Sequence, residues 1–424
     1  MKKYLIYINM VLFGLLFYSC NKKELTIIRP DKKLIENQNE YTKILTEAEY
    51  GWIGYLYPAG GRAYTFKFNF TNENRVFTSG TLDETYTTTG IESSYRLVAD
   101  QTPSLSFDTY TYLHLLSDPD ELIFGGARGR GHVSDFEFAF LKLNKDTIHL
   151  KGNHNGSKLI LVKATKDQDK DFIKKSFATY ARIGQINDFQ HYHKKVRINN
   201  QDFSFTISPH INAMSFYYME GDVFKQKIGI FTTNEHGLLF REPMELAGVS
   251  FQEITNFDIV SKQNTGTFKI NGEKVKIEPL QKPLYIDKHA PNRFREVNKQ
   301  FYSRWMFTVN GKHEALSLRE LPGYAGGVYL SNVNVDRMDA MYLLYISGMR
   351  YVGPVFSTII DQDGVMKFNK YMEAYGFNPG ELISVVRRFN EVWFNEAGYY
   401  VFQTGPTDYD LVNAKDSKTW VRFN

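Results

Sequence analysis

One short segment of the sequence begins like the helix of a zinc protease. His313 and Glu314 match the first half of the H-E-x-x-H pattern, in which two histidines one turn apart bind the metal and the glutamate activates water. Ser317 stands where the second histidine is required, so one metal ligand is missing. The alternating residues around it predict a polar turn before a strand, and a metalloprotease of this type is excluded.

A second group with possible metal ligands is formed by His191 and His193, which would lie on one face of a strand. Zinc and copper sites need three or four converging ligands. Only Asp188 and His210 lie nearby in the sequence, and no pattern fixes the remaining ligands. We therefore predict surface histidines at the end of a helix.

Residues 361–364 resemble the opening of a calcium-binding loop, because Asp361 and Asp363 are followed by Gly364. Val365 stands where a further oxygen ligand is needed, and Met372 stands where the closing glutamate is expected. The segment predicts a turn between two strands.

Asp135 and Glu137 alternate with phenylalanines, so both carboxylates are expected on one face of a strand. Paired carboxylates perform glycoside hydrolysis, but neighbours on one strand are more often a solvated or barrel-lining polar face. The sequence holds no G-x-S-x-G motif, and its one cysteine, Cys20, lies in the N-terminal segment. We predict a protein that is not an enzyme and needs no metal or cofactor, with an undetected hydrolase as an alternative.

The first third of the sequence carries aromatic and basic side chains that could contact a ligand. Tryptophan and tyrosine rings stack on sugar rings and peptide side chains, and a glycine-rich loop over residues 125–131 holds two arginines that could meet an anion. Strands also favour aromatic residues for packing, so a place in the core is the competing interpretation. The predicted ligand-binding residues are Trp52, Tyr55, Tyr57, Tyr64, Arg128 and Arg130.

Cys20 has the position of a lipidated residue. It follows Lys2 and Lys3, an apolar run over residues 4–18, and Ser19, which together form the layout of an export signal. The small residue before the cysteine resembles the lipobox of bacterial lipoproteins, in which cleavage leaves the cysteine lipidated at the new N-terminus. We expect Cys20 to carry palmitate and to anchor the chain in lipid; a cleaved soluble form and a retained anchor are the alternatives.

Charge and composition exclude several classes of protein. The 424 residues include 51 Lys+Arg and 47 Asp+Glu, and loss of residues 1–19 would remove two lysines and no acids, leaving 49 against 47. A net charge this small over such a long chain does not form a phosphate-binding surface. We therefore expect no nucleic-acid partner. Aromatic residues make up 15% of the chain, which supplies the apolar surface of a large core and excludes disorder for most of the chain.

Alternating hydrophobic residues predict antiparallel strands over most of the chain, including residues 63–70 and 104–116. The strongest hairpin turn is Asn271–Gly272. Helices are predicted over residues 165–183, 291–303, 366–376 and 380–394. We expect a mainly β fold with minor α, made of antiparallel β-sandwich or lipocalin-like barrel segments plus an α+β C-terminal region.

These patterns divide the chain into successive parts. The expected parts are a lipoprotein signal peptide over residues 1–19, a tether over 20–30, an N-terminal β-rich domain over 31–165, a helical connector over 166–195, a second β-rich domain over 196–285 and a mixed α+β C-terminal region over 286–424.

Four segments, over residues 51–70, 92–118, 129–152 and 237–257, resemble in order and spacing the Bacteroidetes lipoproteins grouped as domain of unknown function 4302. The resemblance covers residues 34 to 285. It implies an outer-membrane lipoprotein, with exposure on the cell surface as one possibility, encoded beside a SusC/SusD-like importer and a metallohydrolase lipoprotein. The family has no established catalytic residues to transfer to this chain.

The sequence therefore predicts a lipid-anchored outer-membrane accessory protein that binds a glycan or peptide nutrient for a SusC/SusD-like TonB-dependent importer. One alternative is a structural subunit of the importer complex that binds no ligand. The other is the undetected hydrolase.

Overall fold

The computed structural model describes residues 39–99, 102–209, 211–297, 300–304, 307–333, 337–346, 349–377 and 379–424. The predicted signal peptide, the tether and Cys20 lie outside these residues. Among the described helices, none combines the length and the apolar character needed to cross a membrane.

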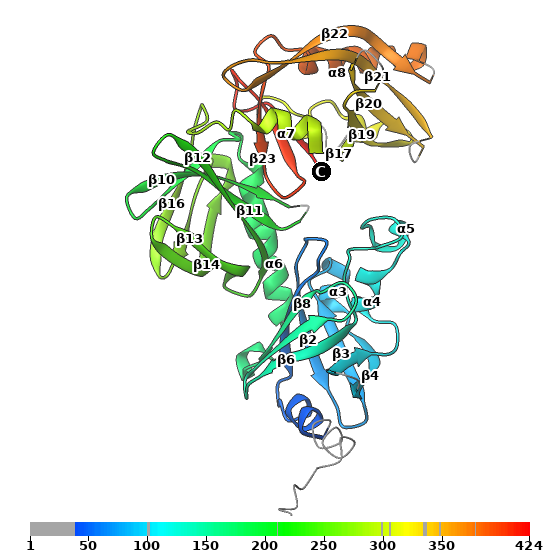
Figure 1. Cartoon of the computed structure of the whole chain (residues 1–424), viewed down its shortest axis with the longest axis vertical. Helices are drawn as coiled ribbons and strands as arrows, with labels where there is room; N and C mark the ends of the chain where they lie inside the picture. Colours follow the sequence, from blue (N-terminus) through cyan, green and yellow to red (C-terminus); the bar gives the residue numbers. More distant parts are fainter. Residues whose placement is uncertain are drawn as a thin grey trace, which may run out of the picture.

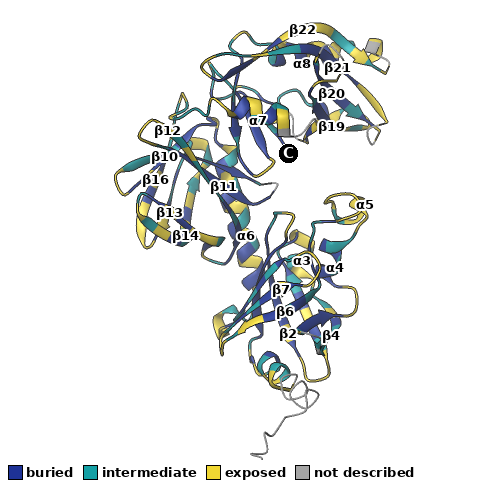
Figure 2. Ribbon diagram, viewed as in Figure 1, coloured by how far each residue is buried: buried dark blue, intermediate teal, exposed yellow. Residues whose placement is uncertain are grey.

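Three β units follow one another along the chain (Figure 1). They are two closed, eight-stranded antiparallel barrels and a nine-stranded antiparallel sheet that carries two helices. The prediction of a mainly β fold with antiparallel barrel segments and an α+β C-terminal region is confirmed. Figure 2 shows buried residues along the strands of all three units and many exposed residues in the turns.

The first barrel runs in sequence order from β1 to β8, and β8 pairs with β1 to close it. Its inward side chains, among them Phe66, Phe68 and Phe107, pack into one core that fills the barrel. A helix over residues 39–46 lies at one end, where the Trp52 indole N–H donates a hydrogen bond of 2.9 Å to the Leu45 carbonyl. The elements are β1 Trp52–Tyr57, β2 Tyr64–Phe70, β3 Arg75–Gly80, α3 Glu84–Thr88, β4 Ile91–Ala99, β5 Pro103–Phe107, α4 Tyr112–Ser117, α5 Glu121–Phe124, β6 Glu137–Leu143, β7 Thr147–Gly152 and β8 Lys158–Lys163.

The second barrel follows a helix, α6, that packs against strands of both barrels. Its core is again filled by aromatic and aliphatic side chains, including Phe205, Phe216 and Phe268. The elements are η1 Lys166–Gln168, α6 Phe172–Gly184, η2 Gln185–Asp188, β9 Lys194–Ile198, β10 Gln201–Ser208, β11 Ala213–Glu220, β12 Val223–Thr233, β13 Gly237–Leu246, β14 Val249–Val260, η3 Ser261–Gln263, β15 Thr265–Ile270 and β16 Glu273–Pro279.

The third unit is a curved sheet with the strand order β17-β19-β20-β21-β22-β23-β24-β25-β18. Helices α7 and α8 bring Phe294, Phe389 and Trp393 into the core on one side of this sheet. The sheet curls until β17 meets the C-terminal residue, because Tyr302 and Asn424 exchange two backbone hydrogen bonds of 2.9 and 2.8 Å. The elements are α7 Ala290–Val297, β17 Gln300–Ser303, β18 Phe307–Thr308, η4 Leu318–Glu320, β19 Tyr324–Leu330, β20 Asp339–Tyr345, β21 Arg350–Ile360, β22 Val365–Gly376, α8 Pro379–Trp393, β23 Tyr399–Gln403, β24 Tyr409–Asn413 and β25 Trp420–Phe423.

Four predicted elements are corrected by the structure. Residues 366–376, expected as a helix, belong to strand β22, which pairs with β21 from Gly376 to Met366. The helix expected over 291–303 ends at Val297 and is followed by β17. Residues 104–116 form β5 and then helix α4 instead of strands alone. The helix expected over 165–183 begins only at Phe172, after the 3-10 turn η1. Pairing with distant strands outweighs local helical spacing in the first case, because strand preference depends on cross-strand packing.

The three units contact one another through buried side chains. Between the barrels, the Thr65 hydroxyl lies 2.7 Å from that of Thr232 and donates to the Thr233 carbonyl at 2.6 Å. Between the second barrel and the C-terminal sheet, the Tyr217 hydroxyl donates to the Gln403 carbonyl at 2.7 Å. Such buried, satisfied polar contacts hold the units in fixed register.

Candidate ligand-binding site

The face of the C-terminal sheet opposite the helices carries a group of tyrosines. Side chains alternate between the two faces of a strand. Phe301, Tyr329 and Leu343 therefore enter the core under the helices, and their neighbours in sequence point the other way. We define the tyrosine surface by the residues that line a hollow of about 460 Å³ there, with Tyr375 beside them: Gln300, Tyr302, Val328, Leu330, Tyr342, Leu344, Tyr351 and Tyr375.

Strand register brings these residues together from five strands, β17, β19, β20, β21 and β22. Tyr302 on β17 pairs with Val328 on β19, and Val328 pairs with Tyr342 on β20. Leu344 on β20 pairs with Tyr351 on β21. The tyrosine surface therefore runs across the strands, which makes its residues neighbours in space although they are scattered along the chain.

The outer tyrosines of this surface are open to solvent. Tyr302 is 48% exposed, Tyr351 39% and Tyr375 49%, whereas Tyr342 between them is only 8% exposed. The Tyr342 ring lies 4.9 Å from the Tyr351 ring and 6.4 Å from the Tyr375 ring, measured between centroids. Rings that already support one another need lose little conformational freedom when a ligand binds.

Burial, with smaller contributions from Tyr351 and Tyr375, raises the pKa of Tyr342 to about 12. The Tyr342 hydroxyl therefore stays protonated at neutral pH and can donate as well as accept a hydrogen bond. The Gln300 side-chain amide hydrogen-bonds to the Tyr302 hydroxyl at the edge of the surface. The surface thus combines apolar ring faces with neutral polar groups.

A smaller hollow of about 170 Å³ adjoins the tyrosine surface, and Tyr351 lines both. Leu321, Phe377 and Leu382 contribute apolar walls to it. The Arg350 guanidinium lies 4.4 Å from the centroid of the Phe377 ring. This hollow adds a cation held by an aromatic ring to the neutral tyrosine surface.

The aromatic residues predicted from the sequence lie elsewhere. Trp52 and Tyr64 belong to the core of the first barrel, and Tyr55 and Tyr57 belong to the cluster that joins that barrel to α6 and the second barrel. All four are buried. A ring buried in this way presents no face to a ligand, so the tyrosine surface is the better candidate.

Arg128 and Arg130 lie in the exposed loop that follows α5 on the first barrel. The Arg128 guanidinium is 3.8 Å from the Glu121 carboxylate, and a bridge between Ala127 and Gly131 closes the loop. Among the described residues, the two arginines make no hydrogen bond, ion pair or ring contact with the four predicted aromatic residues or with the tyrosine surface, although His132 just after their loop packs edge-on against Tyr64 at 6.0 Å.

His191 and His193 are buried, so the prediction of surface histidines is wrong. They lie between the second barrel and the C-terminal sheet, where His191 Nδ1 is 2.7 Å from the Ser417 hydroxyl. Burial, with the neighbouring Lys194 charge, lowers the pKa of His193 to about 3. Within the part of the chain that the structure describes, no three His, Cys, Asp or Glu side chains are placed to hold a metal ion.

The two carboxylates considered for hydrolysis have different surroundings. Asp135 precedes β6 and is buried, and its carboxylate accepts backbone hydrogen bonds from His154, Asn155 and Ser157 at 2.8, 2.8 and 3.0 Å. Glu137 lies at the start of β6, 3.5 Å from the His154 ring. The expectation that both carboxylates share a polar strand face is therefore wrong, because Asp135 anchors the turn between β7 and β8.

The other two motifs form turns. Asp361 lies between β21 and β22, where its carboxylate accepts backbone hydrogen bonds of 3.0 Å from Asp363 and Val365, so the predicted turn is confirmed. His313 lies in the turns after β18, and its Nδ1 is 2.9 Å from the Thr308 hydroxyl.

The fold is that of two packed antiparallel barrels followed by a helix-covered sheet. The chain belongs to the family described as "Domain of unknown function (DUF4302)", whose model matches residues 28–258. The match covers the first barrel and continues into β14 of the second, and the tyrosine surface lies beyond it.

No curated protein matches the sequence. Among solved structures, a protein of unknown function from the DUF3598 family of Nostoc punctiforme is 11% identical, with 72% of this chain and 94% of that chain covered and a TM-score of 0.14. Transferrin binding protein B from Haemophilus parasuis is 9% identical, with 86% and 65% covered and a TM-score of 0.14. The Helicobacter pylori beta clamp is 10% identical, with 92% and 96% covered and a TM-score of 0.11. TM-scores of this size do not establish a shared fold.

Proposed function

We propose that this chain is a lipid-anchored accessory protein that binds an oligosaccharide at the tyrosine surface. The observation that carries the proposal is the open row of tyrosines, with Tyr302, Tyr351 and Tyr375 exposed around the buried Tyr342. Monomeric proteins rarely expose clustered apolar rings without a use for them.

A sugar ring suits this surface better than an ion or a nucleotide does. One face of a pyranose is apolar and can lie against a tyrosine ring, while its rim of hydroxyls needs neutral hydrogen-bonding groups. The tyrosine hydroxyls and the Gln300 amide supply such groups. The eight residues of the tyrosine surface include no charged side chain, and the Arg350 cation of the adjoining hollow lies against the Phe377 ring.

The anchor and the partners of the proposal rest on the sequence. Cys20 would hold the protein at the outer membrane, and the family resemblance suggests a SusC/SusD-like importer and a metallohydrolase lipoprotein as neighbours. An oligosaccharide held on the C-terminal sheet would then be kept close to the importer.

A glycan array probed with the protein, followed by calorimetry on the best oligosaccharide, tests the proposal. We expect Tyr302→Ala and Tyr351→Ala each to weaken binding by about tenfold or more, which corresponds to about 1.4 kcal/mol. Tyr110→Ala is the matched control, because Tyr110 is also an exposed tyrosine but lies on the first barrel.

Absence of glycan binding at millimolar concentration, or equal losses for Tyr110→Ala and Tyr351→Ala, would refute the oligosaccharide site. Binding of a peptide array with the same tyrosine dependence would move the assignment to peptides. Affinity purification of the tagged chain from its own membrane tests the importer partnership separately.

A further inference from the structure

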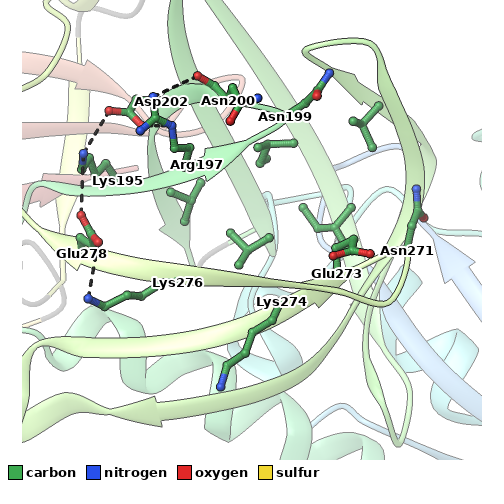
Figure 3. Close-up of a pocket in the computed structure, with 15 residues that line it drawn as sticks. Lys195, Arg197, Asn199, Asn200, Asp202, Asn271, Glu273, Lys274, Lys276 and Glu278 are labelled. Atoms are coloured by element: carbon green, nitrogen blue, oxygen red, sulfur yellow. Dashed lines mark hydrogen bonds and ion pairs between the residues drawn. The ribbon is translucent and has the colours of Figure 1, made fainter.

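The second barrel closes with a short seam between β16 and β9. Only two positions pair across this seam, Glu278 with Lys195 and Pro279 with Lys194. Beyond them the two strands separate, and a cleft of about 640 Å³ opens between them (Figure 3). The cleft lies on a different unit from the tyrosine surface, so it can serve a separate purpose.

On the β9 side of the cleft, the backbone of Arg197 faces the opening. β9 and β10 are joined by a two-residue turn with positive φ at both residues, and Ile198 pairs with Gln201 to close it. The residues that flank such a turn hydrogen-bond to each other, and bonding then alternates along the strand. Ile198 and Val196 therefore bond to β10, while Arg197 turns its N–H and C=O toward β16.

On the β16 side, the same alternation exposes two more residues. The Asn271–Gly272 turn closes at Ile270 and Glu273, so Lys274 and Lys276 turn their backbone groups away from β15 and toward β9. Within residues 194–209 and 211–297, no cross-strand pair joins β16 to β9 beyond Lys195. The cleft therefore has backbone donors and acceptors on both walls.

The floor of the cleft is apolar. It is made by side chains of β9, β14, β15 and β16, of which Val249 is partly exposed and the others belong to the buried core of the barrel: Val196, Ile198, Val249, Ile270 and Val275. An extended chain between β9 and β16 would direct every second side chain to this floor and the others to solvent.

The rim of the cleft carries four basic side chains, Lys195, Arg197, Lys274 and Lys276, and three acidic ones, Asp202, Glu273 and Glu278. Lys195 lies 3.0 Å from Asp202 and 3.7 Å from Glu278, so these acids are already paired. Lys276 is 3.5 Å from Glu278. Lys274 has no ion-pair partner among the described residues, and Figure 3 draws its side chain pointing away from β9.

We propose that this cleft binds an extended segment of a partner protein, which adds a strand between β16 and β9 and carries alternating apolar and acidic side chains. Backbone hydrogen bonds to Lys274, Lys276 and Arg197 supply the attachment, and the apolar side chains occupy the valine and isoleucine floor. The acidic side chains on the outer face meet Lys274 and its basic neighbours. Strand addition of this kind uses main-chain bonds for affinity and alternate side chains for specificity.

The test uses the full-length chain in detergent and a fluorescent acetyl-Glu-Val-Glu-Val-Glu-amide peptide, with binding followed by anisotropy. We expect saturable binding that is lost in two versions of the peptide, N-methylated at the odd or the even residues, because N-methylation removes strand hydrogen bonds. Since these versions leave the protein unchanged, folding of a variant cannot explain the loss. A Lys-Val-Lys-Val-Lys peptide should bind at least about tenfold more weakly.

Two variants place the binding in the cleft. Lys274→Glu should weaken binding of the Glu-Val peptide by about fivefold or more, and Lys262→Glu, a charge change in η3 of the same barrel, should leave it unchanged. Absence of binding at millimolar peptide would overturn the proposal. Binding that survives in both N-methylated peptides would also overturn it, and so would equal losses in Lys274→Glu and Lys262→Glu. Either result would indicate attraction to general surface charge instead of strand addition in the cleft.

Discussion

The two barrels of this chain differ in how they close. In the first barrel, β1 and β8 pair at six positions, from Trp52 with Lys163 to Tyr57 with Lys158. In the second barrel, the equivalent seam pairs at two positions and then opens. Both interiors are filled by phenylalanine-rich cores, so the difference lies in the seam and not in the lumen.

A barrel with a filled interior can offer a ligand only its outer face, its loops or an incomplete seam. The first barrel uses the outer face of β1 to pack against α6 and the second barrel, through Ile53, Tyr55 and Tyr57. The second barrel keeps an open seam. The first barrel therefore has a mainly structural part, and the second offers the proposed contact surface at its seam.

The largest expected effect comes from proline in the two closing strands. Ile160 on β8 pairs with Tyr55 on one side and His149 on the other, so Ile160→Pro removes a hydrogen bond inside the sheet. We expect it to lower the free energy of unfolding by at least about 3 kcal/mol. Lys276→Pro should cost less than about 1 kcal/mol, because the Lys276 N–H faces the open seam. Urea denaturation followed by circular dichroism measures the free energy of unfolding of both variants. Equal losses of stability in Ile160→Pro and Lys276→Pro would contradict the proposed difference between the two seams.

The second largest difference in stability is expected at the turns that precede the closing strands, β8 in the first barrel and β16 in the second. In the first barrel the β7–β8 turn depends on three backbone hydrogen bonds to Asp135, whereas the second barrel uses the compact Asn271–Gly272 turn. Asp135→Asn replaces one acceptor oxygen by a donor and should cost about 2 kcal/mol in unfolding free energy. Glu137→Gln is the matched control, with little expected loss. An unchanged free energy of unfolding in Asp135→Asn would show that the turn forms without the hydrogen bonds to Asp135.

The smallest effect, taken per pH unit, is a dependence on pH that only the second barrel should show. Lys194, the first residue of β9, is buried, and burial together with Arg422 lowers its pKa to about 7. Between this value and the ordinary 10.5, the unfolded chain binds a proton that the folded chain does not. Stability should therefore rise with pH in this window, by about 1.4 kcal/mol per pH unit from this group.

Lys194→Met should remove that slope, and Lys225→Met, on the surface of the same barrel, should keep it. Urea denaturation at a series of pH values from 7 to 10 gives the slopes. If the stability of the unsubstituted chain stays constant or falls between pH 7 and 10, the lowered pKa of Lys194 is contradicted.

Sequence reasoning succeeded where one short segment decides the structure. Asn271 and Gly272 both adopt positive φ, as the hairpin turn requires, and residues 64–70 form β2 as their alternation predicts. These signals are local, because turn geometry and side-chain alternation are fixed within a few residues.

The sequence did not predict the features of the structure that depend on pairing between distant strands. Residues 366–376 have helical spacing, but β21 supplies a pairing partner along almost their whole length. Tyr302, Tyr342 and Tyr351 each stand in a readable strand pattern, yet only the register of β17, β19, β20 and β21 shows that they share one face. The buried positions of His191 and His193 likewise depend on contact between two units that no local pattern reports.

The backbone hydrogen bonds between Asn424 and Tyr302 have a practical consequence for experiments on this protein. Residues fused after Asn424 would start beside β17, at the edge of the tyrosine surface, and could cover it. An affinity tag inserted at the exposed turn around Gly221, between β11 and β12, avoids that edge, since an added side chain there would meet no neighbour within 4 Å. Binding and pull-down results obtained with the two tag positions should be compared before a missing ligand is concluded.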